Sequence, residues 1–190
     1  MKEKIISVLR ESADLKLKFA QESVDSVVSA TEIINKSIKS GGKLLIFGNG
    51  GSASDAQHIA AEFVNRFILE RKALPAVSLS ADSSVLTSIA NDSDFEFVYS
   101  RQIEALGKKN DVAIGLTTSG NSQNVINALK AAKSIGMATI VFTGNNFNKL
   151  KKLSKCIISV PSDSTARVQE IHITVAHIIC ELAEKRFSEK

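Results

Sequence analysis

The segment LLIFGNGGSASDAQHIAAEFVNRF, residues 44–67, contains a strand, a glycine turn and a helix in succession. Leu44–Phe47 form a continuous apolar run, which is typical of a strand buried on both faces of a parallel sheet. The glycines in Gly48–Gly51 can adopt backbone angles that are closed to residues with a Cβ. We expect Ser52 or Ser54 to cap the following helix. Backbone N–H groups, hydroxyls and the positive end of the helix dipole then converge, which predicts an anion site.

The helix after this turn carries three ionisable side chains. Asp55 lies in its expected first turn, where the helix dipole favours a carboxylate. His58 and Glu62 are four residues apart, so they share one helix face about 6 Å apart along the axis. This spacing suits two ligands of one metal ion, or an acid and a base acting on one substrate. A simple surface ion pair is the alternative interpretation.

The composition is that of a soluble globular protein. A chain of 190 residues allows one domain, 1–190, with a substantial core, and 44% hydrophobic and 23% charged residues exclude a disordered chain. The formal charge of +4 is mild, and with no Trp and one Tyr the chain lacks the basic, aromatic surface that binds nucleic acid. We therefore expect no nucleic-acid partner.

The sequence also predicts a cytoplasmic location. Cys156 and Cys180 form no CxxC pattern and lie among apolar residues, which indicates buried free thiols in a reducing compartment. Residues 1–19 have charges throughout and lack the apolar core of a signal peptide. Since no apolar run is long enough to cross a bilayer, we expect no membrane partner.

Residues 2–40 contain no proline or glycine, and their apolar residues recur at helical spacing. This pattern predicts one long helix, or two helices with a bend near Asp14 or Ser23, ended by Gly41-Gly42. We expect this N-terminal segment, 1–40, to bury its apolar stripe both on its own domain and on neighbouring subunits.

The remaining chain alternates strands and helices. Apolar runs predict strands at 76–79, 111–117, 137–143 and 156–160. The segments between and after them predict helices at 82–90 (capped by Asp82), 95–106, 121–135, 149–153 and 165–187. The alternation implies an α/β fold with a parallel sheet, whose ligands bind beyond the carboxyl ends of its strands. Loops 48–54 and 117–122 both follow strands, and they meet if the first and third strands are neighbours.

Loop 117–122, TTSGNS, offers hydroxyls at Thr117, Thr118, Ser119 and Ser122. It contains no Lys or Arg and matches neither the Walker nor the GxGxxG pattern, so nucleotide binding is not indicated. A neutral hydroxyl cradle at a helix start can hold a sugar phosphate through hydrogen bonds and the helix dipole. A capped helix with spare threonines is the alternative, but the pairing with loop 48–54 favours phosphate.

The last helix holds Gln169, Glu170, His172 and His177. A histidine on an otherwise apolar helix face is more often a hydrogen-bonded core residue than a ligand. The residues alone therefore support an α/β protein that binds a phosphorylated small molecule, and they do not identify the reaction.

Four segments, GNGGSASDAQHIAAEFVNRF, IANDSDFEF, TTSGNSQNVINAL and ARVQEIHITVAHII, occur in this order. With them the chain resembles the sugar isomerase (SIS) domain family and, more closely, its phosphoheptose isomerases. The resemblance implies a flavodoxin-like, three-layer α/β/α fold with a five-stranded parallel sheet, and a homotetramer with active sites between subunits. It also implies conversion of D-sedoheptulose 7-phosphate to D-glycero-D-manno-heptose 7-phosphate, the first step of bacterial ADP/GDP-heptose biosynthesis.

The resemblance also implies roles for individual residues. Substrate-binding positions of the family match Asn49, Gly50, Gly51, Ser52, Glu62, Asn91, Asp92, Thr117, Thr118, Ser119, Ser122 and Gln169. Positions that bind one Zn2+ per subunit match His58, Glu62, Gln169 and His177.

Moving a carbonyl between adjacent carbons through an enediol requires a base and an acid close together. Glu62 is the expected base and His177 its acid partner, and zinc could polarise the carbonyl. A zinc-bound carboxylate or imidazole is a poorer base, so coordination is either transient or partly structural; the sequence leaves both open. Gln169 and His177 are eight residues apart, about 12 Å along one helix. We therefore expect at least one zinc ligand from a neighbouring subunit.

Two other functions remain as alternatives. Some SIS-domain proteins are non-catalytic sugar-phosphate-binding regulators or assembly proteins, and others isomerise a hexulose or arabinose phosphate. The presence of Glu62, His177 and the hydroxyl loop favours an enzyme, and the continuous match favours the heptose phosphate.

Overall fold

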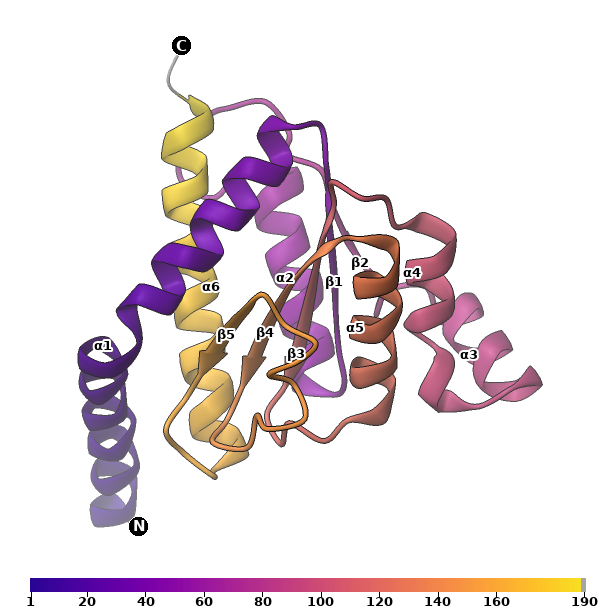
Figure 1. Ribbon diagram of the computed structural model, residues 1–190. Helices are drawn as coiled ribbons and strands as arrows, with labels where there is room; N and C mark the ends of the chain where they lie inside the picture. Colours follow the sequence, from indigo (N-terminus) through magenta and orange to yellow (C-terminus); the bar gives the residue numbers. More distant parts are fainter. Residues whose placement is uncertain (189–190) are drawn as a thin grey trace.

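A computed structural model describes residues 1–188 of the chain. Within them, five parallel strands form one sheet in the order β2-β1-β3-β4-β5 (Figure 1). The strands are β1 (Leu44–Gly48), β2 (Ala76–Ser78), β3 (Val112–Thr117), β4 (Ala138–Thr143) and β5 (Cys156–Ser159). This is the flavodoxin-like order. Since β1 and β3 are neighbours, the loops that follow them begin side by side, as predicted.

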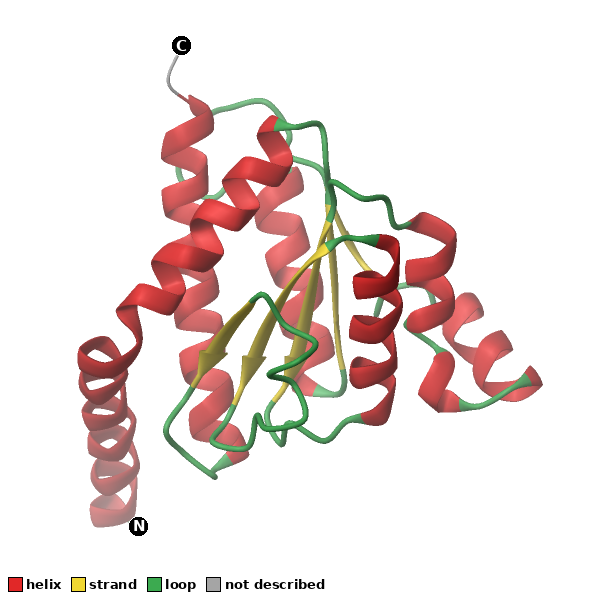
Figure 2. Cartoon of the chain, viewed as in Figure 1, coloured by secondary structure: helices red, strands yellow, loops and turns green. Residues whose placement is uncertain are grey.

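Helices cover both faces of this sheet (Figure 2). They are α1 (Lys2–Lys39), α2 (Gly51–Val64), α3 (Ser83–Asp92), α4 (Ser100–Leu106), α5 (Gln123–Ile135) and α6 (Thr165–Ser188), with a 3-10 turn at Phe95–Phe97. Helices α1, α2 and α6 lie on one face, and α4 and α5 lie on the other. None of the helices within residues 1–188 has the length and apolar character needed to span a membrane.

Alternate residues of β1 face opposite sides of the sheet. Leu44 and Ile46 pack in one hydrophobic core with residues of α1, α2 and α6. Leu45 and Phe47 pack in a second core with residues of α4 and α5. All four side chains are completely buried, which confirms the prediction of a strand covered on both faces. The predicted three-layer α/β/α arrangement is therefore observed.

Helix α1 is continuous from Lys2 to Lys39 and changes direction part-way along its length (Figure 1). Its second half buries Val27 and Ile34 in the core against α6 and β5. Its first half leaves Ile5 and Leu9 exposed. The prediction of one continuous helix is confirmed, although the helix also bends, as the second alternative predicted; packing of the first half on another subunit stays a prediction.

Three local predictions are wrong. Helix α2 begins at Gly51 after Gly50, whose φ of +57° turns the chain directly into the helix, so neither Ser52 nor Ser54 is the N-cap. Consequently Asp55 lies beyond the first turn, and Ser52 is buried.

The other two corrections concern helices. The predicted helix 95–106 is divided into the 3-10 turn and α4, because the Asp94 carboxylate accepts the N–H of Glu96 and starts a tighter turn there. The predicted helix 149–153 is a series of turns, in which the N–H groups of Leu150 and Leu153 bond to carbonyls three residues back.

Candidate active site

The two loops predicted to form the site are joined by a pair of amides. The Asn49 side chain follows β1, and the Asn124 side chain projects from the first turn of α5. Each amide donates to the other, with both N–O distances 2.9 Å. Asn124 is buried, and its side-chain oxygen also accepts the N–H of Val125. This reciprocal pair holds the glycine turn against the start of α5, so the loops converge.

Close packing and a buried tyrosine fix the end of β1. A Cβ on Gly48 would lie 2.8 Å from the Ser52 Cβ and 2.9 Å from the Leu116 carbonyl oxygen, so only glycine fits there. The Gly48 carbonyl accepts hydrogen bonds from the Tyr99 and Ser80 hydroxyls. Burial raises the pKa of the Tyr99 phenol, against a smaller lowering by its hydrogen bond with Ser80. Tyr99 therefore serves as a neutral donor that anchors the turn.

The hydroxyl loop is preorganised at the start of α5. Thr117 is buried, and its hydroxyl donates to the Ser122 hydroxyl at 3.0 Å. The Ser119 hydroxyl is exposed and accepts the N–H of Asn121. Ser122 is the N-cap of α5, and within the described residues its side chain makes no capping hydrogen bond. Asn124 Oδ1 takes up the N–H of Val125, so the N–H groups of Gln123 and Asn124 are the ones in this first turn that no side chain within residues 1–188 bonds, which suits an anion.

A cluster of ionisable side chains lies where α2 and α6 meet. His58 Nε2 is 3.0 Å from Glu62 Oε1, as the four-residue spacing predicted. The same nitrogen lies 3.4 Å from His177 Nε2 of α6. The Phe67 ring stacks on the His177 imidazole with centroids 5.4 Å apart. Glu62 and His177 are half-buried and His58 is exposed, so the cluster is open to a ligand.

The donor spacing in this cluster fits zinc in part. Two ligands on one tetrahedral zinc lie about 3.3 Å apart, which is close to the spacing of the His58–Glu62 and His58–His177 pairs. His58 stands between the other two, however, and no three His, Cys, Asp or Glu side chains within residues 1–188 converge on a single point that could hold a metal. One chain thus supplies two matched donor pairs rather than a closed site.

Gln169 lies apart from this cluster. It contacts the glycine turn, where a Cβ on Gly51 would be 2.6 Å from Gln169 Nε2. His58 is seven residues further along α2, about 10 Å away along the helix axis. The structure of one chain therefore places Gln169 at the glycine turn and brings together only the other three of the four expected zinc ligands.

Asn91 and Asp92 also lie away from the loops. Both are exposed at the end of α3, at the edge of the fold beyond α4 (Figure 1). Their side chains bond to each other, with a distance of 2.9 Å from Asn91 Nδ2 to Asp92 Oδ1. They are not brought to the site within one chain.

Asp55 is an addition that the sequence analysis did not assign to the site. Its Oδ2 is buried and has no hydrogen-bond partner within residues 1–188. Burial raises the pKa of this carboxyl, and the nearby His58 and His177 oppose the shift. Its position one helical turn before His58 was the available signal, since side chains three residues apart share a face.

His172 is the core histidine that its apolar helix face predicted. It is completely buried, and its Nε2 lies 3.3 Å from the Thr143 carbonyl oxygen. Burial lowers its pKa to about 4, against a smaller opposing effect of the Thr143 hydrogen bond, so the ring is neutral at pH 7.

Comparison with known proteins assigns the chain to a family. A family model described as SIS domain matches residues 9–144. The chain is 50% identical to the phosphoheptose isomerase of Aquifex aeolicus (strain VF5) over 190 residues, which cover 100% of both chains. The chain belongs to the phosphoheptose isomerases of the SIS-domain family.

Solved structures of phosphoheptose isomerases have the same fold. That of phosphoheptose isomerase GmhA from Neisseria gonorrhoeae superposes with a TM-score of 0.91 at 39% identity, covering 97% of this chain and 98% of that one. The one from Francisella tularensis gives a TM-score of 0.92 at 31% identity, covering 96% and 97%. The sequence-based assignment to the phosphoheptose isomerases and the flavodoxin-like fold are both confirmed.

Proposed function

We propose that this phosphoheptose isomerase converts D-sedoheptulose 7-phosphate to D-glycero-D-manno-heptose 7-phosphate, the first step of ADP/GDP-heptose biosynthesis. The observation that carries the proposal is the cluster in which His58 contacts both Glu62 and His177, on the helix that begins at the first of two joined polar loops. A carboxylate and an imidazole at this spacing supply the base and acid of an aldose-ketose isomerisation.

The hydroxyl loop is proposed to hold the phosphate. The proposal is supported by the hydroxyls of Thr118, Ser119 and Ser122, which lie in one loop that leads directly into the first turn of α5. Donors of this kind bind a phosphate dianion without a cationic side chain. The glycine turn Asn49–Ser52 is proposed to line the path toward the carbonyl end of the sugar together with Gln169, which lies against Gly51.

Proton transfer is proposed to run between Glu62 and His177. The Glu62 carboxylate removes the proton from the carbon next to the carbonyl, while His177 donates a proton to the carbonyl oxygen, which gives a neutral enediol. Reversal at the adjacent carbon and oxygen completes the isomerisation. Atoms and electrons balance within the sugar, so no redox cofactor is needed.

One Zn2+ per subunit is proposed to be held by His58, Glu62 and His177 with Gln169. The donor pairs of α2 and α6 support this set, and the distance of Gln169 from them supports a ligand contributed by a neighbouring subunit. When bound, the ion would polarise the sugar carbonyl.

A homotetramer with active sites between subunits is also proposed. The exposed apolar side chains of α1, among them Ile5, Leu9 and Leu17, support burial against a neighbouring subunit. The exposure of Asn91 and Asp92 at the end of α3 supports the proposal that they act at the site of a neighbouring subunit. A cytoplasmic location is supported by the free, buried Cys156 and Cys180.

The test is turnover of D-sedoheptulose 7-phosphate by the purified protein, followed as aldoheptose phosphate with and without a chelator and added zinc. We expect turnover in the wild type that collapses in Glu62→Gln and His177→Ala. Absence of turnover in a folded, zinc-loaded tetramer would contradict the proposal and would point to a regulator or to another sugar phosphate.

A further inference from the structure

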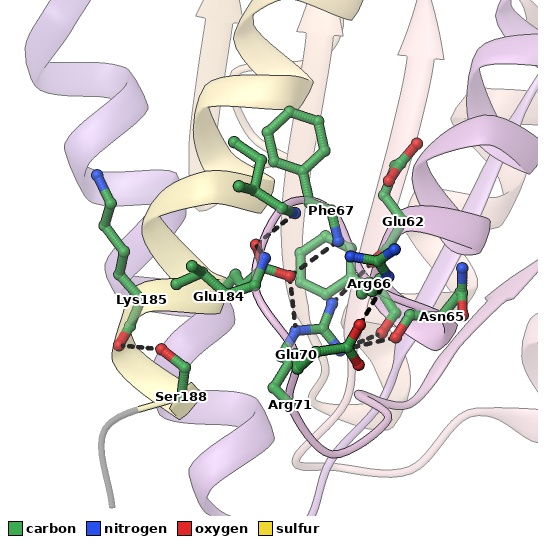
Figure 3. Close-up of polar contacts among 12 residues, drawn as sticks. Glu62, Asn65, Arg66, Phe67, Glu70, Arg71, Glu184, Lys185 and Ser188 are labelled. Atoms are coloured by element: carbon green, nitrogen blue, oxygen red, sulfur yellow. Dashed lines mark hydrogen bonds and ion pairs between the residues drawn. The ribbon is translucent and has the colours of Figure 1, made fainter.

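A buried carboxylate far from the substrate loops joins the ends of α2 and α6. Glu184 of α6 is 1% exposed. Its two oxygens accept the backbone N–H groups of Phe67, Ile68 and Leu69 at 2.7–2.8 Å (Figure 3). These three residues belong to the segment that leaves α2, so one side chain fixes the path of that segment.

Arg71 completes the junction. Its Nε lies 3.3 Å from Glu184 Oε1, and both side chains are almost wholly buried. The guanidinium also donates to the carbonyl oxygens of Glu62 at 2.7 Å and Phe63 at 2.9 Å (Figure 3). These carbonyls are among the last four of α2, which have no partner within a helix. Arg71 therefore caps the turn of α2 that carries the proposed base.

The same junction reaches the proposed acid. Glu184 is seven residues after His177 on α6, so the two side chains lie on nearly the same face about 10 Å apart. Glu184 binds the N–H of Phe67, and the ring of Phe67 stacks on the His177 imidazole with an interplanar angle of 29°. The ion pair thus acts on both partners, on Glu62 through its backbone and on His177 through an aromatic ring.

The bonding pattern favours a geometric role over a purely stabilising one. Burying an ion pair has a desolvation cost that often cancels its attraction, and apolar replacements can be as stable. Here the charged groups bind seven backbone groups around one turn, three N–H groups through Glu184 and four carbonyls through Arg71. Burial alone would raise the pKa of Glu184, but the three N–H groups and Arg71 outweigh it and lower the pKa. The Glu184 carboxylate is therefore ionised at pH 7.

We infer that the Glu184–Arg71 ion pair is a positioning device that sets the distance and orientation of Glu62 relative to His177. This inference rests on the proposed function, in which these two residues exchange protons with the sugar. A displacement of about 1 Å in such a pair costs up to about 100-fold in rate. The hydroxyl loop makes no contact with the ion pair, so binding of the phosphate should be unaffected by its loss.

The test compares Glu184→Gln with Glu181→Gln in the full-length, zinc-loaded protein. Glu181 is on the same helix in a partly exposed pair with Lys185, so its variant is the matched control. We expect kcat per folded protein to fall about 10- to 100-fold in Glu184→Gln, with KM for sedoheptulose 7-phosphate within about twofold of the wild type. The control should change neither value. Unchanged kcat in a folded Glu184→Gln protein would overturn the inference.

Two further measurements test the positioning role separately from the folding of Glu184→Gln and from turnover in the wild type. If Glu184→Gln does not fold, Phe67→Leu, which keeps the ion pair and removes the ring, should lower kcat about 10-fold, and an unchanged kcat would count against the inference. If the wild type shows no turnover, the proposed function fails independently. The nitrogen chemical shifts of the His177 imidazole must then still differ between Glu184→Gln and the wild type; identical shifts would overturn the positioning role.

Discussion

Two polar clusters lie along the line where α2 and α6 meet, and they differ in how their groups are bonded. In the cluster of Asp55, His58, Glu62 and His177, side chains contact one another and remain accessible, and Asp55 Oδ2 is buried without a partner within residues 1–188. At the Glu184–Arg71 junction, both carboxylate oxygens are bonded to backbone N–H groups, and the side chains are almost wholly buried; Arg71 Nε faces Glu184 Oε1 at 3.3 Å but has no hydrogen-bond partner within residues 1–188. The first cluster is accessible to a ligand and is called the open cluster below; the second is buried against the backbone and is called the closed junction.

The largest effect should come from the open cluster. Glu62→Gln keeps the shape of the side chain but removes the base, so we expect kcat to fall by about 10²- to 10⁴-fold. The melting temperature should change little, because Glu62 is half-buried and its carboxylate bonds to no side chain other than His58 within residues 1–188. Steady-state kinetics and thermal unfolding measure both. Glu104→Gln, at an exposed pair with Arg101, is the control. A large loss of stability in Glu62→Gln would remove the distinction between the two clusters.

The closed junction should show the reverse pattern. Arg71→Ala leaves the buried Glu184 carboxylate without its cation and removes the guanidinium from two carbonyls of α2, of which that of Phe63 keeps the N–H of Leu74. We expect the free energy of unfolding to fall by about 3–5 kcal/mol. Urea unfolding monitored by circular dichroism gives the value. Arg101→Ala, which removes an exposed pair, should cost less than about 1 kcal/mol. Equal effects of the two substitutions would contradict the role assigned to the junction.

His172 of α6 is a further buried ionisable group, and its ring contacts the Thr143 carbonyl oxygen of β4. Its pKa is lowered from 6.5 to about 4 by burial, so the folded state binds fewer protons than the unfolded state between these values. The stabilisation is complete above pH 6.5 and is lost as pH falls toward 4, by on the order of 3 kcal/mol. Unfolding free energies measured across this range should show that slope. His172→Gln should flatten it, and a retained slope would exclude His172 as its source.

The smallest effect should come from the amide pair that joins the loops. Asn124→Ala removes both hydrogen bonds with Asn49, each contributing about 1 kcal/mol. We expect KM for the sugar phosphate to rise about 5- to 20-fold, since the glycine turn is no longer held against the start of α5, while kcat falls less. Gln123→Ala, next to it and exposed, should leave KM unchanged. A kcat defect without a KM defect would show that the pair serves the chemistry and not binding.

The sequence predicted the features that depend on neighbours in the chain. Four consecutive apolar residues identified β1 because burial on both faces requires them, and the spacing of His58 and Glu62 identified their contact. The start of α2 was misplaced because Gly50 adopts a positive φ, which a serine-rich segment does not reveal. The predicted roles in zinc binding and catalysis stay predictions.

Other features depend on residues that are distant in the sequence. Asn49 and Asn124, or Arg71 and Glu184, become partners only after the sheet order and the packing of α2 on α6 are known. Arg71 and Glu184 each look like ordinary surface charges in their own segments. No local pattern distinguishes them from the exposed Glu181 or Lys185, so their burial could not be anticipated.

Helices α2 and α6 run side by side in the same direction, with Gly51 beside Gln169, His58 beside His177 and Phe67 beside Glu184. The glycine turn, the proposed acid and base, and the ion-pair junction therefore follow one another along the same pair of helices. A single residue inserted early in either helix would rotate everything after it by about 100° and shift it by about 1.5 Å. Such an insertion would separate the proposed acid from the proposed base and break the junction at once. These two segments should therefore tolerate many changes of residue type but almost none of length.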